Sequence, residues 1–360
     1  MRQANFEILR VVAMFMIVFW HFIQNVMMRT DAMEESSIVS VVNYIILQYG
    51  MILCSVGVNL YVMVTGYFLV DKSFKSNRIF RVWIQTTFYS FFIALLFYSI
   101  QPENTSIKDV LVGFIPIRSG AYWFVTDYLG LILVAPFLGK AAKALSYRQY
   151  IRLLAVIILV GTNFIGGYPL GDSMGGNMGY SLIWFVCLFM IGAFIRLHGN
   201  KIPSYNYLKF YLITGGFVFI YFVIRQFIKM GFSFEGLKYE DLHYNSFPAI
   251  LAFLLFIWFK CKKIQNNNLT SFLVKIAPYT FGVYLIHNNR FVSSHLWNAI
   301  PNNIHNSYYT FFAAFAICVT IFILCIIIDY VRDKLFKISG AHNFILLLSN
   351  QFDNKLKKFV

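Results

Sequence analysis

Three ionisable residues share one face of the first apolar segment of the chain: Glu7, Arg10 and His21. The segment reads NFEILRVVAMFMIVFWH. Eleven residues at 100° each return to within about 20° of the starting direction, so Arg10 and His21 lie on one helix face, roughly 16 Å apart. Glu7 lies on that face one turn before Arg10. A neutral imidazole accepts a proton near neutral pH, so the pattern indicates general-base chemistry with these three as candidate catalytic residues.

The segment that carries them is apolar from about residue 6 to residue 28. This length crosses a bilayer and places His21 past the midplane. Ionisable groups at that depth cost roughly 2.5 to 3.5 kcal/mol when charged and are usually kept for function. The sequence therefore predicts an integral membrane protein with chemistry inside it. Two simpler interpretations stay open: His21 as a hydrogen-bonded packing residue, and Arg10 as a side chain that reaches the headgroups while paired with Glu7.

The composition supports the membrane class. Apolar residues make up 59% of the chain and charged residues 12%, and the mean hydropathy is +0.65. The net charge of +15 falls in short basic clusters between apolar runs, which is typical of membrane orientation and argues against nucleic acid as a partner. The five cysteines are scattered without metal-type or redox spacing, so we expect neither a metal site nor a disulfide framework.

Ten apolar segments can be marked, and they predict an all-α fold, a polytopic bundle of about ten transmembrane helices. The first segment is interpreted as a retained helix because no small-residue cleavage site follows it. We expect one transmembrane domain over residues 1–331 and then a basic amphipathic tail over 332–360 on the inner membrane surface. The segments cover approximately residues 6–28, 51–70, 79–100, 121–139, 149–165, 179–197, 206–228, 246–260, 271–288 and 307–331.

The charges between the segments predict their sidedness. If the chain starts in the cytoplasm, basic residues fall in inner loops and most acidic residues in outer loops, and the reverse topology reverses every asymmetry. Both termini are therefore expected in the cytoplasm. The inner basic residues are Lys72, Lys75, Arg78, Arg81, Lys140, Lys143, Arg148, Arg152, Arg196, Lys201, Lys209, Lys260, Lys262 and Lys263, and the outer acidic residues are Asp31, Glu34, Glu35, Glu103, Asp109, Asp172, Glu235, Glu240 and Asp241.

Four motifs in order along the chain resemble those of the acyltransferase 3 family, which are ten-helix bacterial membrane proteins. The first is the spacing of acid, arginine and histidine in the first segment. The second is VNLYVMVTGYFLV over 58–70, where Thr65 stands in for the family's serine, followed by a basic inner loop. The others are AYWFVTDYLGLILVAPFL over 121–138 and YTFGVYLIH over 279–287. The chain thus looks like a family member over nearly the whole bundle.

The resemblance implies transfer of an acyl group, commonly acetyl from acetyl-CoA, to a hydroxyl of a cell-surface polysaccharide or its lipid-linked glycan precursor. It implies a location in the bacterial cell membrane, the plasma or inner one. A sugar hydroxyl is a poor nucleophile, and a positioned base such as His21 contributes typically 10² to 10⁴-fold. Transient acylation of His21 is the alternative to direct transfer. The phosphates of acetyl-CoA suit Arg10, Arg78 and Arg81 at the inner face, although Arg78 and Arg81 could equally be topology anchors.

Candidates for binding the acceptor lie at the outer face: Tyr122, Trp123, Asp127 and His287. Aromatic residues stack on sugars, but they also form ordinary interfacial belts. His287 could orient an acceptor or simply pack at the interface. Family members often place a glutamate five residues after the tryptophan; Tyr128 occupies that position here, so no carboxylate role passes to Asp127. The glycine-rich outer loop over 166–180 could wrap closely around a glycan backbone, but it is interpreted as a connector.

A function of a different class is also compatible with a ten-helix bundle. It is a multi-pass transporter or flippase for a glycan or a small metabolite. Such proteins tend to show inverted repeats and paired helices broken by Gly or Pro near the midplane, and neither is evident in this sequence. The acyltransferase is therefore the favoured prediction.

Overall fold

The computed structural model describes residues 3–27, 38–117, 121–161, 179–230, 246–265, 267–301, 304 and 307–356. Across these residues the chain is helical and contains no strand, which confirms the all-α prediction. The α-helices are α1 (Ala4–Phe22), α2 (Ile38–Cys54), α3 (Gly57–Leu69), α4 (Asn77–Ile100), α5 (Ile107–Val112), α6 (Trp123–Ala144), α7 (Tyr147–Gly161), α9 (Leu182–His198), α10 (Tyr207–Met230), α11 (Ser246–Cys261), α12 (Asn268–Ile276), α13 (Thr280–His287), α14 (Arg290–Asn298), α15 (Thr310–Ile338) and α16 (Ala341–Leu356).

Every predicted apolar segment coincides with helix, but fewer than ten helices reach spanning length. Seven helical stretches in the described part of the chain are long and apolar enough to cross a membrane. Two further apolar helices, α9 and α11, are shorter. A multi-pass membrane protein is thus supported, while the number ten stays a prediction. The spanning stretches are Ala4–Met27, Val42–Leu69, Asn77–Ile100, Trp123–Ala144, Tyr207–Ile224, Asn268–His287 and Thr310–Ile338.

The boundaries of two predicted segments were wrong. The second begins at Ile38 and not at residue 51, and α2 and α3 meet at a short break after Cys54. Polar residues made the start of α2 resemble a loop, yet Asn43 is buried and donates to Thr310 Oγ1 at 3.0 Å and to the Ser307 carbonyl at 2.8 Å. The last segment is also longer than predicted, because α15 continues to Ile338.

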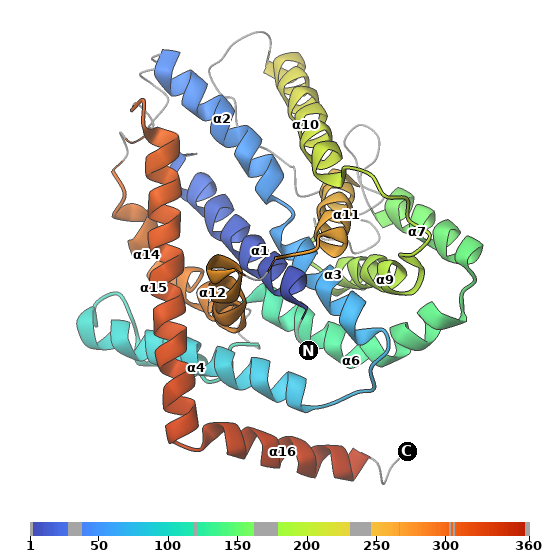
Figure 1. The fold of residues 1–360 in the computed structure, drawn as a ribbon. Helices are drawn as coiled ribbons and strands as arrows, with labels where there is room; N and C mark the ends of the chain where they lie inside the picture. The colour runs from blue at the N-terminus through green and yellow to red at the C-terminus, as the bar shows by residue number, and fades with distance from the viewer. Residues whose placement is uncertain are drawn as a thin grey trace.

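Helix α1 lies at the centre of the bundle, in contact with α2, α3, α11, α12, α13 and α15 (Figure 1). Behind it, α3 and α9 pack against each other most closely. Gly192 of α9 faces the backbone of Met63 so closely that a Cβ atom would clash there. Most residues of α9 are buried, and α3 in turn packs against α1.

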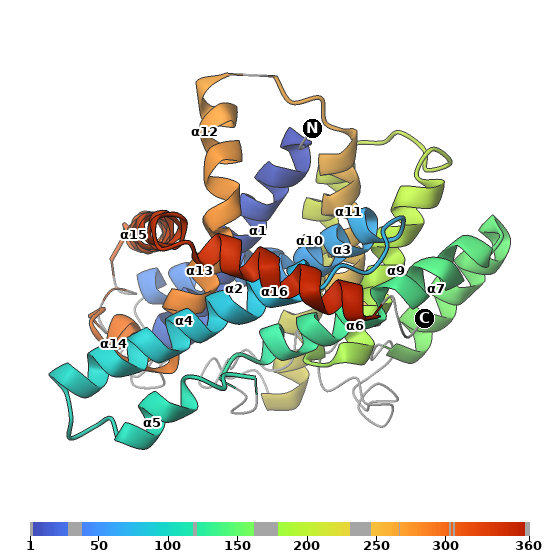
Figure 2. The same ribbon diagram turned by 90° about the horizontal axis from the view of Figure 1, so that it is seen from below.

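Side-chain contacts join the predicted inner loops at the end of the bundle where α1 begins. Asn5 donates to the Phe259 carbonyl at 3.1 Å, and Lys260 donates to the Gly199 carbonyl at 2.7 Å. Arg196 pairs with Asp71 at 3.4 Å. Figure 2 shows the start of α1 beside the connection from α11 to α12 at this end. The basic loops thus share one side of the bundle, as the charge pattern predicts.

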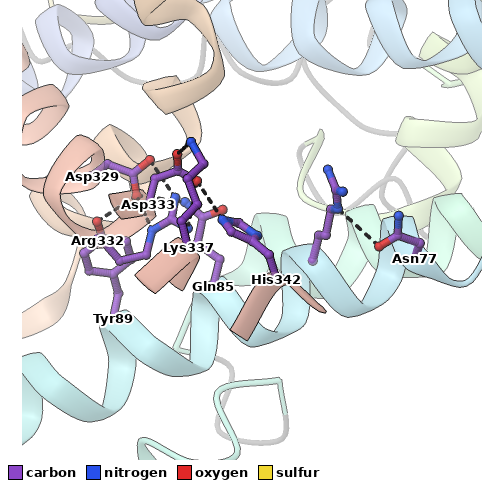
Figure 3. Close-up of polar contacts among 9 residues, drawn as sticks. Asn77, Gln85, Tyr89, Asp329, Arg332, Asp333, Lys337 and His342 are labelled. Atoms are coloured by element: carbon purple, nitrogen blue, oxygen red, sulfur yellow. Dashed lines mark hydrogen bonds and ion pairs between the residues drawn. The ribbon is translucent and has the colours of Figure 1, made fainter. Parts of the chain in front are cut away.

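A buried ion cluster holds α15 against α4 near this end (Figure 3). Asp329 is fully buried and accepts hydrogen bonds from Tyr89 at 2.7 Å and from Gln85 at 3.0 Å. Arg332 donates to both oxygens of the same carboxylate, each at 3.0 Å. The neighbouring Asp333 accepts from Lys337 at 2.6 Å and pairs with His342 of α16 at 3.0 Å. Every carboxylate of the cluster is therefore partnered.

Helix α16 lies beside α4 (Figures 1 and 2) and is attached to the start of that helix. Ser76 Oγ donates to the Ser349 carbonyl at 3.0 Å, and the Ser76 backbone N–H donates to Asp353 Oδ1 at 3.1 Å. The residues after Ile338 therefore form a helix docked on the bundle. Its separation from the domain over 1–331, and its place on the membrane surface, stay predictions.

Candidate active site

His21 and His287 meet directly, although the sequence analysis assigned them to different roles. His21 Nδ1 and His287 Nε2 lie 2.9 Å apart. His21 is half-buried near the end of α1, and His287 is fully buried at the end of α13. A five-residue π-helical turn, Ile23–Met27, follows α1, and such turns occur frequently at functional sites.

The helix backbone fixes which nitrogen of each ring carries a proton. His287 Nδ1 lies 2.6 Å from the Val283 carbonyl, which can only accept, so this nitrogen carries the proton. Nε2 of a neutral His287 is then an acceptor, and His21 Nδ1 must donate to it. A neutral His21 in this tautomer carries its lone pair on Nε2, the nitrogen that can act as a base.

His21 lines a cavity of about 260 Å³. Aromatic residues form much of its wall, because Trp20, Trp123 and Trp184 all line it. The ring of Trp123 packs edge-on against that of Tyr180, with centroids 4.4 Å apart. Trp184 is fixed by α9 and donates its indole N–H to Asn59 Oδ1 at 3.3 Å. The arrangement offers flat apolar surfaces beside a base, which suits a molecule with both hydroxyl groups and apolar ring faces.

The charged pair at the entrance of α1 forms as the spacing predicts. Arg10 Nη1 lies 3.0 Å from Glu7 Oε1, and Glu7 is buried while about a third of the Arg10 side chain is exposed. The Tyr61 hydroxyl contacts the Arg10 carbonyl at 3.0 Å and Thr280 Oγ1 at 2.7 Å. The turn of α1 that carries Arg10 is thus tied to α3 and α13.

The two arginines of the basic inner loop have different surroundings. Arg78 donates to the Ser73 carbonyl at 2.9 Å and interacts electrostatically with Tyr128, which in turn lies within electrostatic range of Tyr61. Arg78 is half-buried and lies within electrostatic range of Tyr128 on α6. Arg81 is exposed and donates to Asn77 Oδ1 at 3.1 Å, the separate contact in Figure 3.

Tyr122 and Asp127 are not brought to the His21 cavity. Tyr122 is buried, and its hydroxyl donates to the Leu285 carbonyl at 2.9 Å while it accepts from Asn289 at 2.8 Å. It lines a second cavity, of about 290 Å³, with Asp109 and Arg290. Asp127 is half-buried on α6 and lines neither cavity.

Two charged residues of opposite sign line the second cavity. Asp109 forms an ion pair with Arg290. Hydrogen bonds from the Ser106 backbone and hydroxyl, and then the Arg290 guanidinium, hold the pKa of Asp109 below its usual value. This pair joins α5 to the start of α14.

Several polar residues of the His21 cavity were missed by the sequence analysis, among them Asn59, Tyr284 and Asn288. Tyr284 lies one turn before His287, so the helical spacing in YTFGVYLIH could have indicated it, and Asn288 directly follows this motif. Of the glycine-rich loop over 166–180, residues 166–178 lie outside the described residues, and Gly179 and Tyr180 line the cavity. No group of three potential metal ligands occurs within the described ranges, and the expectation of a metal-free site stays a prediction.

Comparison with known proteins agrees with the resemblance seen in the motifs. The Acyl_transf_3 family model, described as an acyltransferase domain, matches residues 3–330. The chain therefore belongs to this acyltransferase family, as the motifs predicted. Neither the comparison with curated proteins nor the comparison with solved structures gave a match.

Proposed function

We propose that this membrane acyltransferase is an O-acetyltransferase, which transfers acetyl from acetyl-CoA to a hydroxyl of a cell-surface polysaccharide or of its lipid-linked precursor. The observation that carries the proposal is the His21–His287 hydrogen bond at 2.9 Å on the wall of a cavity. It provides a base of defined tautomer beside a space for the two substrates.

In this mechanism His21 accepts and then returns one proton. Its Nε2 takes the proton of the acceptor hydroxyl while the hydroxyl oxygen bonds to the thioester carbonyl carbon. The tetrahedral intermediate then collapses, the carbon–sulfur bond breaks, and the thiolate leaving group takes the proton from His21. His287 does not exchange a proton. It accepts from His21 Nδ1 throughout and keeps the imidazole in the reactive orientation.

The donor would bind at the end of the bundle that carries the basic loops, which we assign to the cytoplasm. Arg10 and Arg78 are the candidates for its phosphates, because both are partly buried cations, Arg10 within electrostatic range of Tyr61 and Arg78 of Tyr128. Arg81 has no comparable position and is better explained as a topology anchor. The pantetheine arm would then extend along the α1 face towards His21, over roughly 16 Å.

The acceptor would enter the cavity from the opposite side. Trp123 and Trp184 offer ring faces on which a sugar can stack, as aromatic residues do in many apolar sites. Tyr122 supports this wall from behind through its bond to the Leu285 carbonyl. A role for Asp127 has no support from its position.

The decisive experiment uses membranes of the producing cell and radiolabelled acetyl-CoA. We expect label to enter the glycan fraction, and mass analysis of that fraction to show an added acetyl ester. A transporter has no reason to act on a thioester, so membranes that contain the protein but neither hydrolyse acetyl-CoA nor transfer its acetyl group would reject the proposal. Label found with a longer acyl donor such as succinyl-CoA, and not with acetyl-CoA, would correct the donor.

A further inference from the structure

The hydroxyl of Tyr284 is buried on the wall of the His21 cavity without a hydrogen bond of its own. The residue is 4% exposed, and its Oη atom has no hydrogen-bond partner among the described residues. The Asn288 side chain and the Phe124 backbone N–H lie beside this oxygen without completing a bond of good geometry. Buried polar groups are nearly always paired, so an unpaired hydroxyl at a cavity has hydrogen-bonding capacity that a ligand can use.

The start of α6 adds a second donor group at the same place. The first N–H groups of a helix have no partner within the helix and form its positive end. Helix α6 begins at Trp123, and the residue before it, Tyr122, provides no side-chain cap. The Tyr122 hydroxyl is used elsewhere, since it donates to the Leu285 carbonyl. The N–H of Phe124 is therefore not used within the helix, and it lies beside the Tyr284 hydroxyl.

The geometry points to an oxyanion-binding site formed by the Tyr284 hydroxyl, the Asn288 amide and the start of α6. The inference rests on the proposed function, and it assigns the group that binds the acyl carbonyl oxygen. As the acceptor oxygen attacks, this carbonyl oxygen gains negative charge, and the Tyr284 O–H and the Phe124 N–H donate to it. When the carbon–sulfur bond breaks, the carbonyl double bond forms again and the negative charge passes to the sulfur of the leaving thiolate. His21 handles the proton, and Tyr284 touches only the oxygen.

If Tyr284 had only a structural role, the loss of its hydroxyl would leave activity unchanged. Its ring packs against Phe124 and Tyr122, with centroids 5.5 Å and 5.9 Å away, and phenylalanine would preserve these contacts. If packing were the only role, loss of the hydroxyl would cost nothing in activity. Removal of an unpaired buried hydroxyl also leaves stability unchanged or improved, whereas removal of a paired one lowers it. Activity and stability therefore separate the two roles.

The test compares Tyr284→Phe with Tyr150→Phe. Tyr150 is a matched control because it is fully buried on α7, does not line the cavity, and donates its hydroxyl to the Met190 carbonyl at 2.9 Å. In membranes given radiolabelled acetyl-CoA, we expect Tyr284→Phe to lower kcat for transfer about a hundredfold, with little change in the KM for acetyl-CoA. Its melting temperature should equal or exceed that of the parent. Tyr150→Phe should melt lower and keep the parent kcat.

The outcomes distinguish this inference from the proposed function. A parent protein that transfers no acetyl contradicts the function itself. An active parent with an equally active Tyr284→Phe variant contradicts only the oxyanion site. A Tyr284→Phe variant that melts well below the parent shows that the hydroxyl is paired, and this also overturns the inference.

Discussion

Ionisable side chains are buried in two regions of the molecule, and the two regions differ in how completely these side chains are hydrogen-bonded. Around Asp329, two helices supply four donor contacts to one carboxylate, and the cluster fills the space between α4 and α15. Around His21, the hydrogen bond of the imidazole is made to His287, which lies outside the cavity lining, and polar residues such as His21 and Tyr284 line the cavity itself. A buried charge that is fully partnered holds helices together. A buried polar group beside a cavity is available to a substrate.

One short helix connects the two regions. Gly282 of α13 lies directly against the Asp329 side chain, where a Cβ atom would clash. Five residues later the same helix carries His287, and Tyr284 lies between them. The ion cluster thus supports the helix that places Tyr284 on the cavity wall and His287 against His21. The first region is a support for the second.

The largest effect is expected from His21→Gln. An amide cannot take a proton from a hydroxyl, so transfer should fall by the 10² to 10⁴-fold that a general base contributes. The variant should insert and melt like the parent, as measured by thermal unfolding in detergent and by transfer from radiolabelled acetyl-CoA. His295→Gln, at an exposed histidine outside the cavity, is the control. A His21→Gln protein that keeps more than about a tenth of the rate would place His21 among the structural residues.

Asp329→Ala should reverse this pattern. It leaves the Arg332 guanidinium buried without its carboxylate, which costs about 3–5 kcal/mol of unfolding free energy. We expect a much lower melting temperature and, at low temperature, a smaller loss of activity per folded molecule than in His21→Gln, because α13 loses a support but keeps His287 and Tyr284. Asp333→Ala removes the carboxylate that pairs with the exposed Lys337 and with His342 but leaves Asp329 with Arg332, so it should lower the melting temperature much less. Equal losses in the two variants would remove the distinction between the fully buried Asp329 and the more exposed Asp333.

A smaller effect is expected at His287, which acts through His21. His287→Leu removes the acceptor for His21 Nδ1 and frees the ring to reorient, so kcat should fall about 10 to 100-fold. His287→Gln can still accept through its amide oxygen and should recover part of the rate. The measurement is kcat in membranes alongside the KM for acetyl-CoA, which we expect to change little. Identical kcat values for the Leu and Gln variants would contradict the positioning role.

The smallest effect concerns donor binding at the basic end. Arg78 is partly exposed, so Arg78→Ala should weaken acetyl-CoA binding about fivefold, and the loss should shrink at high salt. Arg81→Ala is the matched control three residues away, and its binding should equal that of the parent. Titration with acetyl-CoA at two salt concentrations measures both. If both variants bind as the parent does, the donor site lies elsewhere.

Much of the helical architecture follows from the sequence because apolar length alone marks a membrane span. The ion pair of Glu7 and Arg10 could also be predicted from the sequence, since the two residues are separated by about one helical turn. The start of α2 could not be predicted in this way, because Asn43 is polar and its partners, Ser307 and Thr310 at the start of α15, are more than 260 residues away. Polarity indicates a loop until the buried partner is known.

The site was predicted in its parts and not in its assembly. His21 and His287 were both candidates, but 266 residues separate them and no local pattern encodes their contact. Arg78 and Arg81 appear equivalent in a sequence, and only the neighbouring helices distinguish them. Tyr284 carries a positional signal, because it lies one turn before His287, yet its unpaired hydroxyl is visible only when the surrounding helices are in place.

The long separation between the two histidines has a consequence for biogenesis. A chain emerging from the ribosome inserts α1 first, and the helix carrying His287 reaches the membrane only after most of the bundle has been made. Until then His21 has no imidazole neighbour, and its tautomer is not set by α13. A nascent or truncated chain therefore holds a histidine that is not yet positioned for the reaction, and catalytic competence arises late, when the first and the penultimate spanning helices come together.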